Sequence, residues 1–169
     1  MASGDTLLIL NAHGSVPPAT IYATLDVIPA TTATPDINST VLDFDSATDE
    51  YADWLVVMPR HYGGGGITLT FMWTGTPTSG TVAWACQIRR EENSSAHITG
   101  AFASAVVASA DTVEGTARNM NYTTLAMTDG AQIDSVAVGE SMTVRVYRDI
   151  SADNMASDAE LHRIEIKET

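Results

Sequence analysis

The stretch Ile67-Thr68-Leu69-Thr70-Phe71-Met72-Trp73 alternates large apolar residues with threonines and one methionine. Side chains that alternate in a strand point to opposite faces, so the four large apolar side chains share one face. Residues 82–88 repeat this alternation after the turn-rich residues 75–80. Two such strands joined by a short loop of Gly and Pro residues predict an antiparallel hairpin.

Six other segments after residue 40 show a weaker alternation and are predicted to be strands: residues 41–45, 51–58, 103–109, 122–128, 142–147 and 161–167. In the last segment Leu161 falls on the opposite parity from Ile164 and Ile166, which predicts a β-bulge near His162. Eight short strands without a long amphipathic helix predict an all-β fold. We expect an antiparallel two-sheet sandwich, an eight-stranded jelly roll, over residues 40–169.

Residues 1–39 differ from the rest and are predicted to form an extended N-terminal segment. Two short apolar runs mark it as a candidate contact region with other subunits: Leu7, Leu8, Ile9 and Leu10, followed by Val16, Pro17 and Pro18. The prolines hold the second run in an extended conformation. Two interpretations stay open, an arm that packs on a neighbouring molecule and an extra edge strand on the chain's own sandwich.

The charge of the chain excludes several classes of partner. Among 169 residues, 8 are Lys or Arg and 21 are Asp or Glu, which gives a net charge of −13. Such a chain repels phosphate backbones and anionic lipid surfaces, so we expect neither nucleic acid nor membranes as partners. No apolar run reaches the length of a membrane span, and the start lacks the basic region of a secretory signal. One cysteine, Cys86, excludes an internal disulfide.

Chemically active motifs are not evident, so we expect neither catalysis nor a cofactor. The four histidines, His13, His61, His97 and His162, lie in separate regions without zinc-ligand spacing. The run of glycines at 63–66 lacks the lysine of a phosphate loop and indicates a flexible connection or a close backbone approach.

Acidic loops are the nearest match to a metal site. Asp43, Asp45 and Asp49 cluster at a predicted strand end, and residues 149–160 form a second acidic loop that includes Asp153 and Asp158. Such carboxylates are weak candidates for Ca²⁺ ligands. The other interpretation is that each is a solvated turn whose charges protect strand edges.

A set of short phrases runs through nearly the whole chain. They include Met1-Ala2-Ser3-Gly4-Asp5-Thr6-Leu7-Leu8-Ile9, Tyr22-Ala23-Thr24-Leu25-Asp26, Val41-Leu42-Asp43-Phe44-Asp45, Met58-Pro59-Arg60-His61-Tyr62 and Asp158-Ala159-Glu160-Leu161. In these phrases the chain resembles a family of small β-sandwich virion structural proteins of tailed bacteriophages. Residues 29–39 depart from the family, because this connection is longer than usual.

The resemblance implies a capsid decoration (cement) protein, located on the outer capsid surface of the virion and made in the host cytoplasm. Its implied partners are the major capsid protein and further copies of itself, as a homo-oligomer and most simply a trimer. The alternative is a tail or fibre component that contacts a host receptor or glycan. For that alternative His61 and Tyr62, beside the glycine run, are the candidate contact residues.

Overall fold

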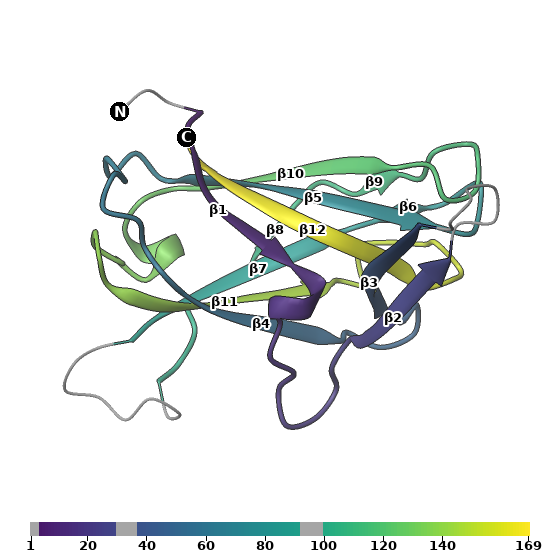
Figure 1. Ribbon diagram of the computed structural model, residues 1–169, viewed down its shortest axis with the longest axis horizontal. Helices are drawn as coiled ribbons and strands as arrows, with labels where there is room; N and C mark the ends of the chain where they lie inside the picture. The colour runs from purple at the N-terminus through teal and green to yellow at the C-terminus, as the bar shows by residue number, and fades with distance from the viewer. Residues whose placement is uncertain (1–3, 30–36, 92–99) are drawn as a thin grey trace.

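The computed structural model describes residues 4–29, 37–91 and 100–169. Two antiparallel β-sheets pack face to face in these residues (Figure 1), which confirms the predicted all-β sandwich. Each of the eight segments predicted after residue 40 overlaps an observed strand. No helix within the described ranges has the length and apolar character that a membrane-crossing helix needs.

The larger sheet has six strands, and the smaller has four. In the larger sheet the order is β10 (Asn121–Met127), β5 (Ile67–Gly75), β12 (Ala159–Glu168), β3 (Asn38–Phe44) and β2 (Thr24–Pro29), with β1 (Thr6–Asn11) also paired to β12. In the smaller sheet the order is β4 (Tyr51–Val57), β11 (Ser141–Arg148), β7 (Trp84–Arg90) and β8 (Val106–Val107). The short strands β6 (Thr81–Val82) and β9 (Asp111–Thr112) pair with each other. The described residues also contain two single-turn 3₁₀ helices, η1 (Ala12–Gly14) and η2 (Ala131–Ile133).

The predicted hairpin of residues 67–73 and 82–88 is wrong, because the two strands lie in different sheets. Strand β5 pairs with β10 and β12, whereas β7 pairs with β11 and β8. Their apolar faces meet across the core, where Trp84 stacks on Phe71 with ring centroids 5.4 Å apart. Alternation identified the buried face of each strand correctly, but it contains no information on which strand lies alongside.

The predicted bulge near His162 is confirmed and divides β12 into two parts. The register of β12 against β5 shifts between Leu161 and Arg163. Before the shift β12 pairs with β3, and after it β12 pairs with β1. Since β5 occupies the other edge throughout, β3 and β1 follow one another along a single edge of β12.

The N-terminal segment joins both sheets, so the division at residue 39 does not separate a free arm from the sandwich. Strand β1 and strand β2 belong to the larger sheet (Figure 1). Between them the chain crosses to the free edge of β4, where Val16 bridges Asp53 and Tyr22 bridges Tyr51. The edge-strand interpretation therefore describes β1. Of the connection at residues 29–39, residues 30–36 lie outside the described part.

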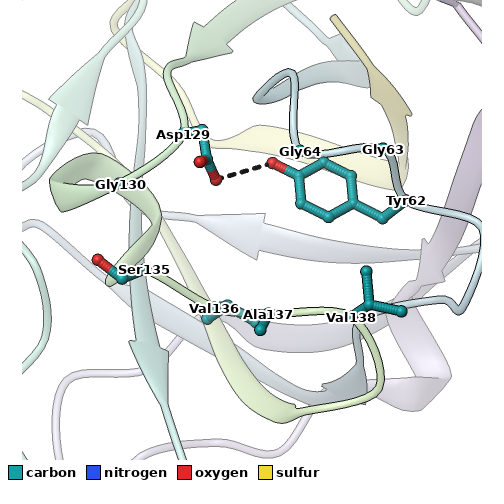
Figure 2. A pocket seen from close by; sticks show the side chains of 9 residues that line it. All are labelled: Tyr62, Gly63, Gly64, Asp129, Gly130, Ser135, Val136, Ala137 and Val138. Carbon is teal, nitrogen blue, oxygen red and sulfur yellow. Dashed lines mark hydrogen bonds between the residues drawn. The ribbon is translucent and has the colours of Figure 1, made fainter.

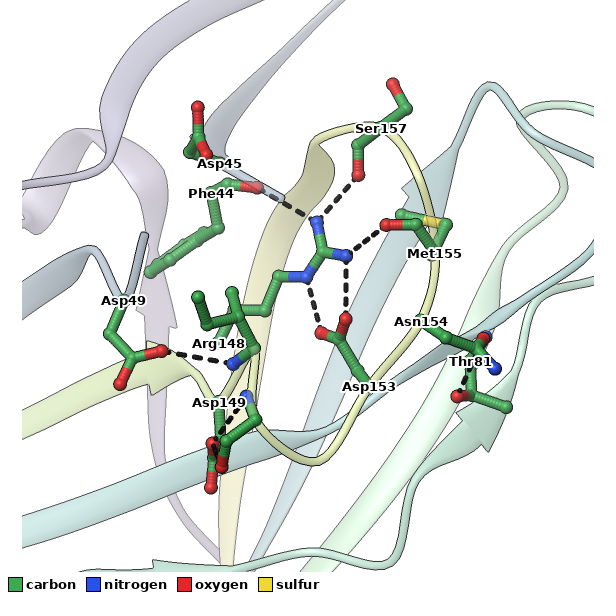
Figure 3. Close-up of polar contacts among 12 residues, drawn as sticks. Phe44, Asp45, Asp49, Thr81, Arg148, Asp149, Asp153, Asn154, Met155 and Ser157 are labelled. Carbon is green, nitrogen blue, oxygen red and sulfur yellow. Dashed lines mark hydrogen bonds and ion pairs between the residues drawn. The ribbon is translucent and has the colours of Figure 1, made fainter. Parts of the chain in front are cut away.

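Arg148 at the end of β11 is fully buried and uses all five of its N–H donors (Figure 3). Its guanidinium forms a bidentate pair with Asp153, at 2.6 and 3.0 Å. It also donates to the carbonyl oxygens of Phe44, Met155 and Ser157, at 3.4, 2.5 and 2.6 Å. The side chain thus ties β3 and β11 to the loop after β11, and it closes one end of the core.

The glycine run is a site of close backbone approach. A Cβ on Gly63 would lie 2.6 Å from a carboxylate oxygen of Glu168, and one on Gly66 would lie 2.6 Å from the carbonyl oxygen of Met127. Gly66 also has a φ of 92°, in the region that side chains disfavour. Glycine is therefore needed at Gly66, where the 58–66 connection packs against the backbone after β10, whereas a side chain at Gly63 would displace the Glu168 carboxylate.

The substitution Arg148→Met is expected to destabilise the fold by about 3–5 kcal/mol, because it leaves the buried Asp153 carboxylate without a counter-charge. Urea unfolding followed by tryptophan fluorescence measures the change. The control is Arg118→Met, whose arginine is 50% exposed in its 3.6 Å pair with Glu160; because Glu160 keeps its hydrogen bond from Thr74, this change should cost less than about 1 kcal/mol. Equal losses in the two variants would contradict the structural role of Arg148.

Candidate functional site

A band of exposed apolar side chains covers the crossing between β1 and β2. We call Val16, Pro17, Ile21 and Tyr22 the 16–22 surface. Val16 is 51% exposed and Tyr22 is 45% exposed. No charged residue occurs between Thr6 and Leu25, so this surface is neutral in a strongly acidic chain. Exposed apolar surface of this kind is typical of a contact with another macromolecule.

Backbone hydrogen bonds to β4 hold the 16–22 surface in place despite a strained residue. Ile21 has a φ of 55°, a left-handed conformation that costs a β-branched residue about 1–2 kcal/mol. Two backbone hydrogen bonds hold the segment there: Tyr51 N–H donates to Ile21 O, and Ala23 N–H donates to Tyr51 O, each at 3.1 Å. Local sequence offers no reason for this conformation, so it is imposed by the pairing with β4.

A hollow of about 400 Å³ lies between the 16–22 surface and β2. Pro17, Tyr22, Leu25 and Leu42 form its apolar lining, and Ser15 is among its polar residues. Leu25 lies opposite Leu42 on the core-side face of the larger sheet, yet it remains exposed. The hollow therefore opens where the larger sheet extends beyond the smaller one.

The seven predicted interface residues separate into two groups. Leu7 and Leu10 are buried in the hydrophobic core and are therefore inaccessible to a partner, whereas Leu8 is partly buried and packs against the core. Ile9, Val16 and Pro17 are exposed, and Pro18 is partly buried. The correction has a simple cause, since β1 uses its inward-facing leucines to complete the chain's own sandwich. Ile21 and Tyr22 were missed by sequence reasoning because their exposure depends on the strained crossing.

A second hollow, of about 340 Å³, adjoins the glycine run and is lined by Tyr62, Gly63, Asp129 and residues 135–138 among others (Figure 2). Under the tail or fibre alternative Tyr62 was a candidate contact residue, but its side chain is buried. Its hydroxyl donates to Asp129 Oδ1 at 3.1 Å and accepts from Gly66 N–H at 3.0 Å. Burial raises the pKa of Tyr62. Tyr62 therefore fixes the glycine loop, and only His61 of the pair is exposed.

Several carboxylates of the two acidic loops accept backbone hydrogen bonds or form an ion pair. Asp45 accepts a hydrogen bond from the backbone of Ala47, and Asp49 accepts one from Ile150 N–H at 3.0 Å. Asp153 of the second acidic loop pairs with Arg148. Within the described ranges, no three His, Cys, Asp or Glu side chains are grouped as metal ligands. Of the histidines, His97 lies outside the described part.

Asp43 lies on the outer face of the larger sheet, in an acidic row with Asp26 of β2 and Glu160 of β12. Its Cα is paired with Glu160 in the β3–β12 ladder. Partial burial, followed by repulsion from Asp26 and Glu160, raises the pKa of Asp43 from 3.8 to about 6. The carboxylates on this part of the sheet face therefore repel one another at neutral pH.

A hydrogen-bond chain supports the bulge in β12. Thr74 Oγ1 donates to Glu160 Oε2 at 2.6 Å, so it accepts from His162 Nε2 at 3.0 Å. The other ring nitrogen, Nδ1, then accepts from Ser39 Oγ at 2.8 Å. Burial lowers the pKa of His162, which favours the neutral ring that this arrangement needs. The network explains structurally why a polar residue occupies the bulge.

Comparison with known proteins identifies the fold. No protein-family model and no curated protein sequence matches the chain. The CBM22-1 xylan-binding domain from Paenibacillus barcinonensis Xyn10C is similar in structure, with a TM-score of 0.52 and 13% identity over 99% of this chain and 97% of that one. CsCBM6-3 from Clostridium stercorarium, solved in complex with cellobiose, has a TM-score of 0.51 and 9% identity over 98% and 99% of the two chains. The chain therefore shares the β-sandwich jelly-roll fold of these domains.

The raised pKa of Asp43 predicts how stability depends on pH. An acid whose pKa is higher in the folded state stabilises the fold below its unfolded pKa, and this contribution is lost as pH rises through the folded pKa. Wild-type stability should therefore fall between about pH 4 and the folded pKa of about 6. Asp43→Asn should lack this fall and be more stable than wild type at pH 8, by on the order of 1 kcal/mol after solvent screening. Thermal unfolding across pH measures it; parallel curves for the two proteins would contradict it.

Proposed function

We propose that the chain is a virion structural protein of a tailed bacteriophage, a capsid decoration protein. In this proposal it binds the outer head surface between capsomers as an oligomer, a trimer in the simplest case, and stabilises the shell. The observation that supports it best is the 16–22 surface, which is apolar, uncharged and held in place by hydrogen bonds to β4. The sequence resemblance supplies the phage setting.

Adhesion through this surface suits a protein of net charge −13. The acidic remainder of the molecule keeps particles apart in solution, while the neutral 16–22 surface is free of like-charge repulsion at the contact. A copy that bridges two capsomers adds interfaces that must break before the capsomers separate. Linked copies strengthen the attachment further by avidity. The proposal requires no covalent chemistry.

The proposal predicts that Val16→Ser combined with Tyr22→Ser weakens binding to heads assembled from the cognate major capsid protein. Loss of two contacts of about 1–1.5 kcal/mol each, about 2–3 kcal/mol together, corresponds to an affinity that is roughly 30- to 150-fold weaker. Co-sedimentation with purified heads measures it. The matched control is Leu55→Ser with Val57→Ser on β4, whose residues are 49% and 54% exposed.

Both double variants must keep the wild-type thermal unfolding curve, since only surface side chains change. Equal head binding by the two variants would place the contact elsewhere on the molecule. Deletion of residues 1–20 is unsuitable as a test, because it would remove β1 and its core leucines from the sandwich.

A second candidate function is glycan binding, and the hollow beside Tyr22 favours it. There a half-exposed aromatic ring adjoins apolar and small polar groups in a space of about 400 Å³. This arrangement suits a sugar ring, which offers both an apolar face and hydroxyls, and domains of the same fold include a xylan-binding one.

The glycan binding of the single variant Tyr22→Ser, together with the copy number per virion, distinguishes the two functions. If the hollow binds sugar, this variant should lose glycan-array signals of the wild-type protein, and the chain should be present in a few to tens of copies per virion. Decoration instead predicts hundreds of copies per virion and no glycan signal. Quantitative mass spectrometry of purified virions gives the copy number.

A further inference from the structure

Strand β2 leaves one edge of the larger sheet open. It is the last strand of the sheet, and no strand within the described ranges pairs with its outer edge (Figure 1). Proteins usually block such edges with charges, bulges or prolines within the strand. Here β2 pairs with β3 in continuous register over six residues, it carries one charged residue, Asp26, and its proline is the terminal Pro29. The backbone of β2 is therefore free to accept another strand.

The core-side face of β2 is also uncovered. Leu25 and Val27 point to the same side as the core residue Leu42, yet they are 53% and 47% exposed. The smaller sheet ends before it reaches them, so an added strand would find apolar side chains as well as backbone hydrogen-bond groups. This combination favours a partner strand that presents small or branched apolar side chains of its own.

Two copies of β2 can pair in antiparallel fashion with complementary side chains in one register. In an antiparallel pair related by a two-fold axis, a residue on the axis faces its own copy, and side chains of equal parity share a face. With Val27 on the axis, Leu25 lies opposite Pro29, and Asp26 lies opposite Ile28. Five residues of each strand then pair, and the apolar side chains meet on the core side.

Neighbouring registers are less favourable. With Asp26 on the axis, two carboxylates would face each other, which destabilises a sheet. The acidic row of Asp26 and Asp43 would make this repulsion stronger. With Leu25 on the axis, only three residues of each β2 strand would pair. The Val27 register is therefore the one that both charge and length favour.

We propose that β2 binds β2 of a second copy in antiparallel fashion with Val27 on the two-fold axis. The contact joins the two larger sheets into one continuous sheet and covers Leu25 and Val27 in both copies. It lies beside the 16–22 surface without using its residues, and it does not depend on capsid binding. An isologous contact closes after two copies, so it differs from the threefold association proposed for the shell.

A cysteine on the axis tests the register directly. In oxidised Val27→Cys the two sulfurs face each other across paired strands, whose Cα separation of about 4.5–5.5 Å permits a disulfide. In Leu25→Cys the two copies of the new residue are four positions apart along the strands, about 13 Å, and beyond disulfide reach. The native Cys86 is fully buried and does not compete.

Non-reducing electrophoresis after mild oxidation should show a covalent dimer for Val27→Cys and at least tenfold less for Leu25→Cys, a residue of similar exposure. Equal cross-linking of both variants, or none of either, would overturn the proposed register.

Light-scattering mass measurement tests the association itself. Wild-type protein at about 100 μM should be dimeric, and Val27→Lys should be monomeric because two ammonium groups would face each other on the axis. Val57→Lys, on the exposed face of β4, is the matched control and should remain dimeric. A monomeric or trimeric wild type would overturn the β2 contact. Head binding by monomeric Val27→Lys, measured separately, reports on the decoration proposal, so the failures of the two proposals are distinguishable.

Discussion

The buried guanidinium of Arg148 determines how the two sheets close at one end. A charge without solvent is costly unless every donor finds an acceptor. Here the bidentate Asp153 pair and three backbone carbonyls satisfy it completely. Because those acceptors belong to β3 and to the loop that leads into β12, the network connects the end of β11 to the start of the last strand.

β12 is the strand around which the larger sheet is organised. It pairs with β5 along one edge and with β3 and then β1 along the other. The bulge at His162 separates the two partners, and the hydrogen bonds from Ser39 and to Thr74 fix its position. The N-terminal segment completes this sheet and then crosses to β4, so its leucines stabilise the fold and its crossing residues are left at the surface.

The two candidate contact surfaces, the 16–22 surface and the outer edge of β2, differ in the groups that they expose. The 16–22 surface consists of exposed apolar side chains and is held by backbone hydrogen bonds to β4. The β2 edge adds backbone groups that pair with no strand in the described part of the chain, which makes it directional and suited to a strand. An acidic chain gains from concentrating its contacts in such a region, since charge repulsion opposes association elsewhere on its surface.

The sequence by itself determined which residues face inward, because alternation in a strand is a local property. It located eight strand segments after residue 40 and the bulge, which shows as a change of parity at Leu161. Only the tertiary structure decided which strands are neighbours, and it placed β5 and β7 in opposite sheets. It also decided that Tyr62 is buried and that Tyr22 is exposed. Pairing, burial of a loop aromatic and a left-handed backbone all depend on contacts between residues distant in sequence, which a local pattern does not encode.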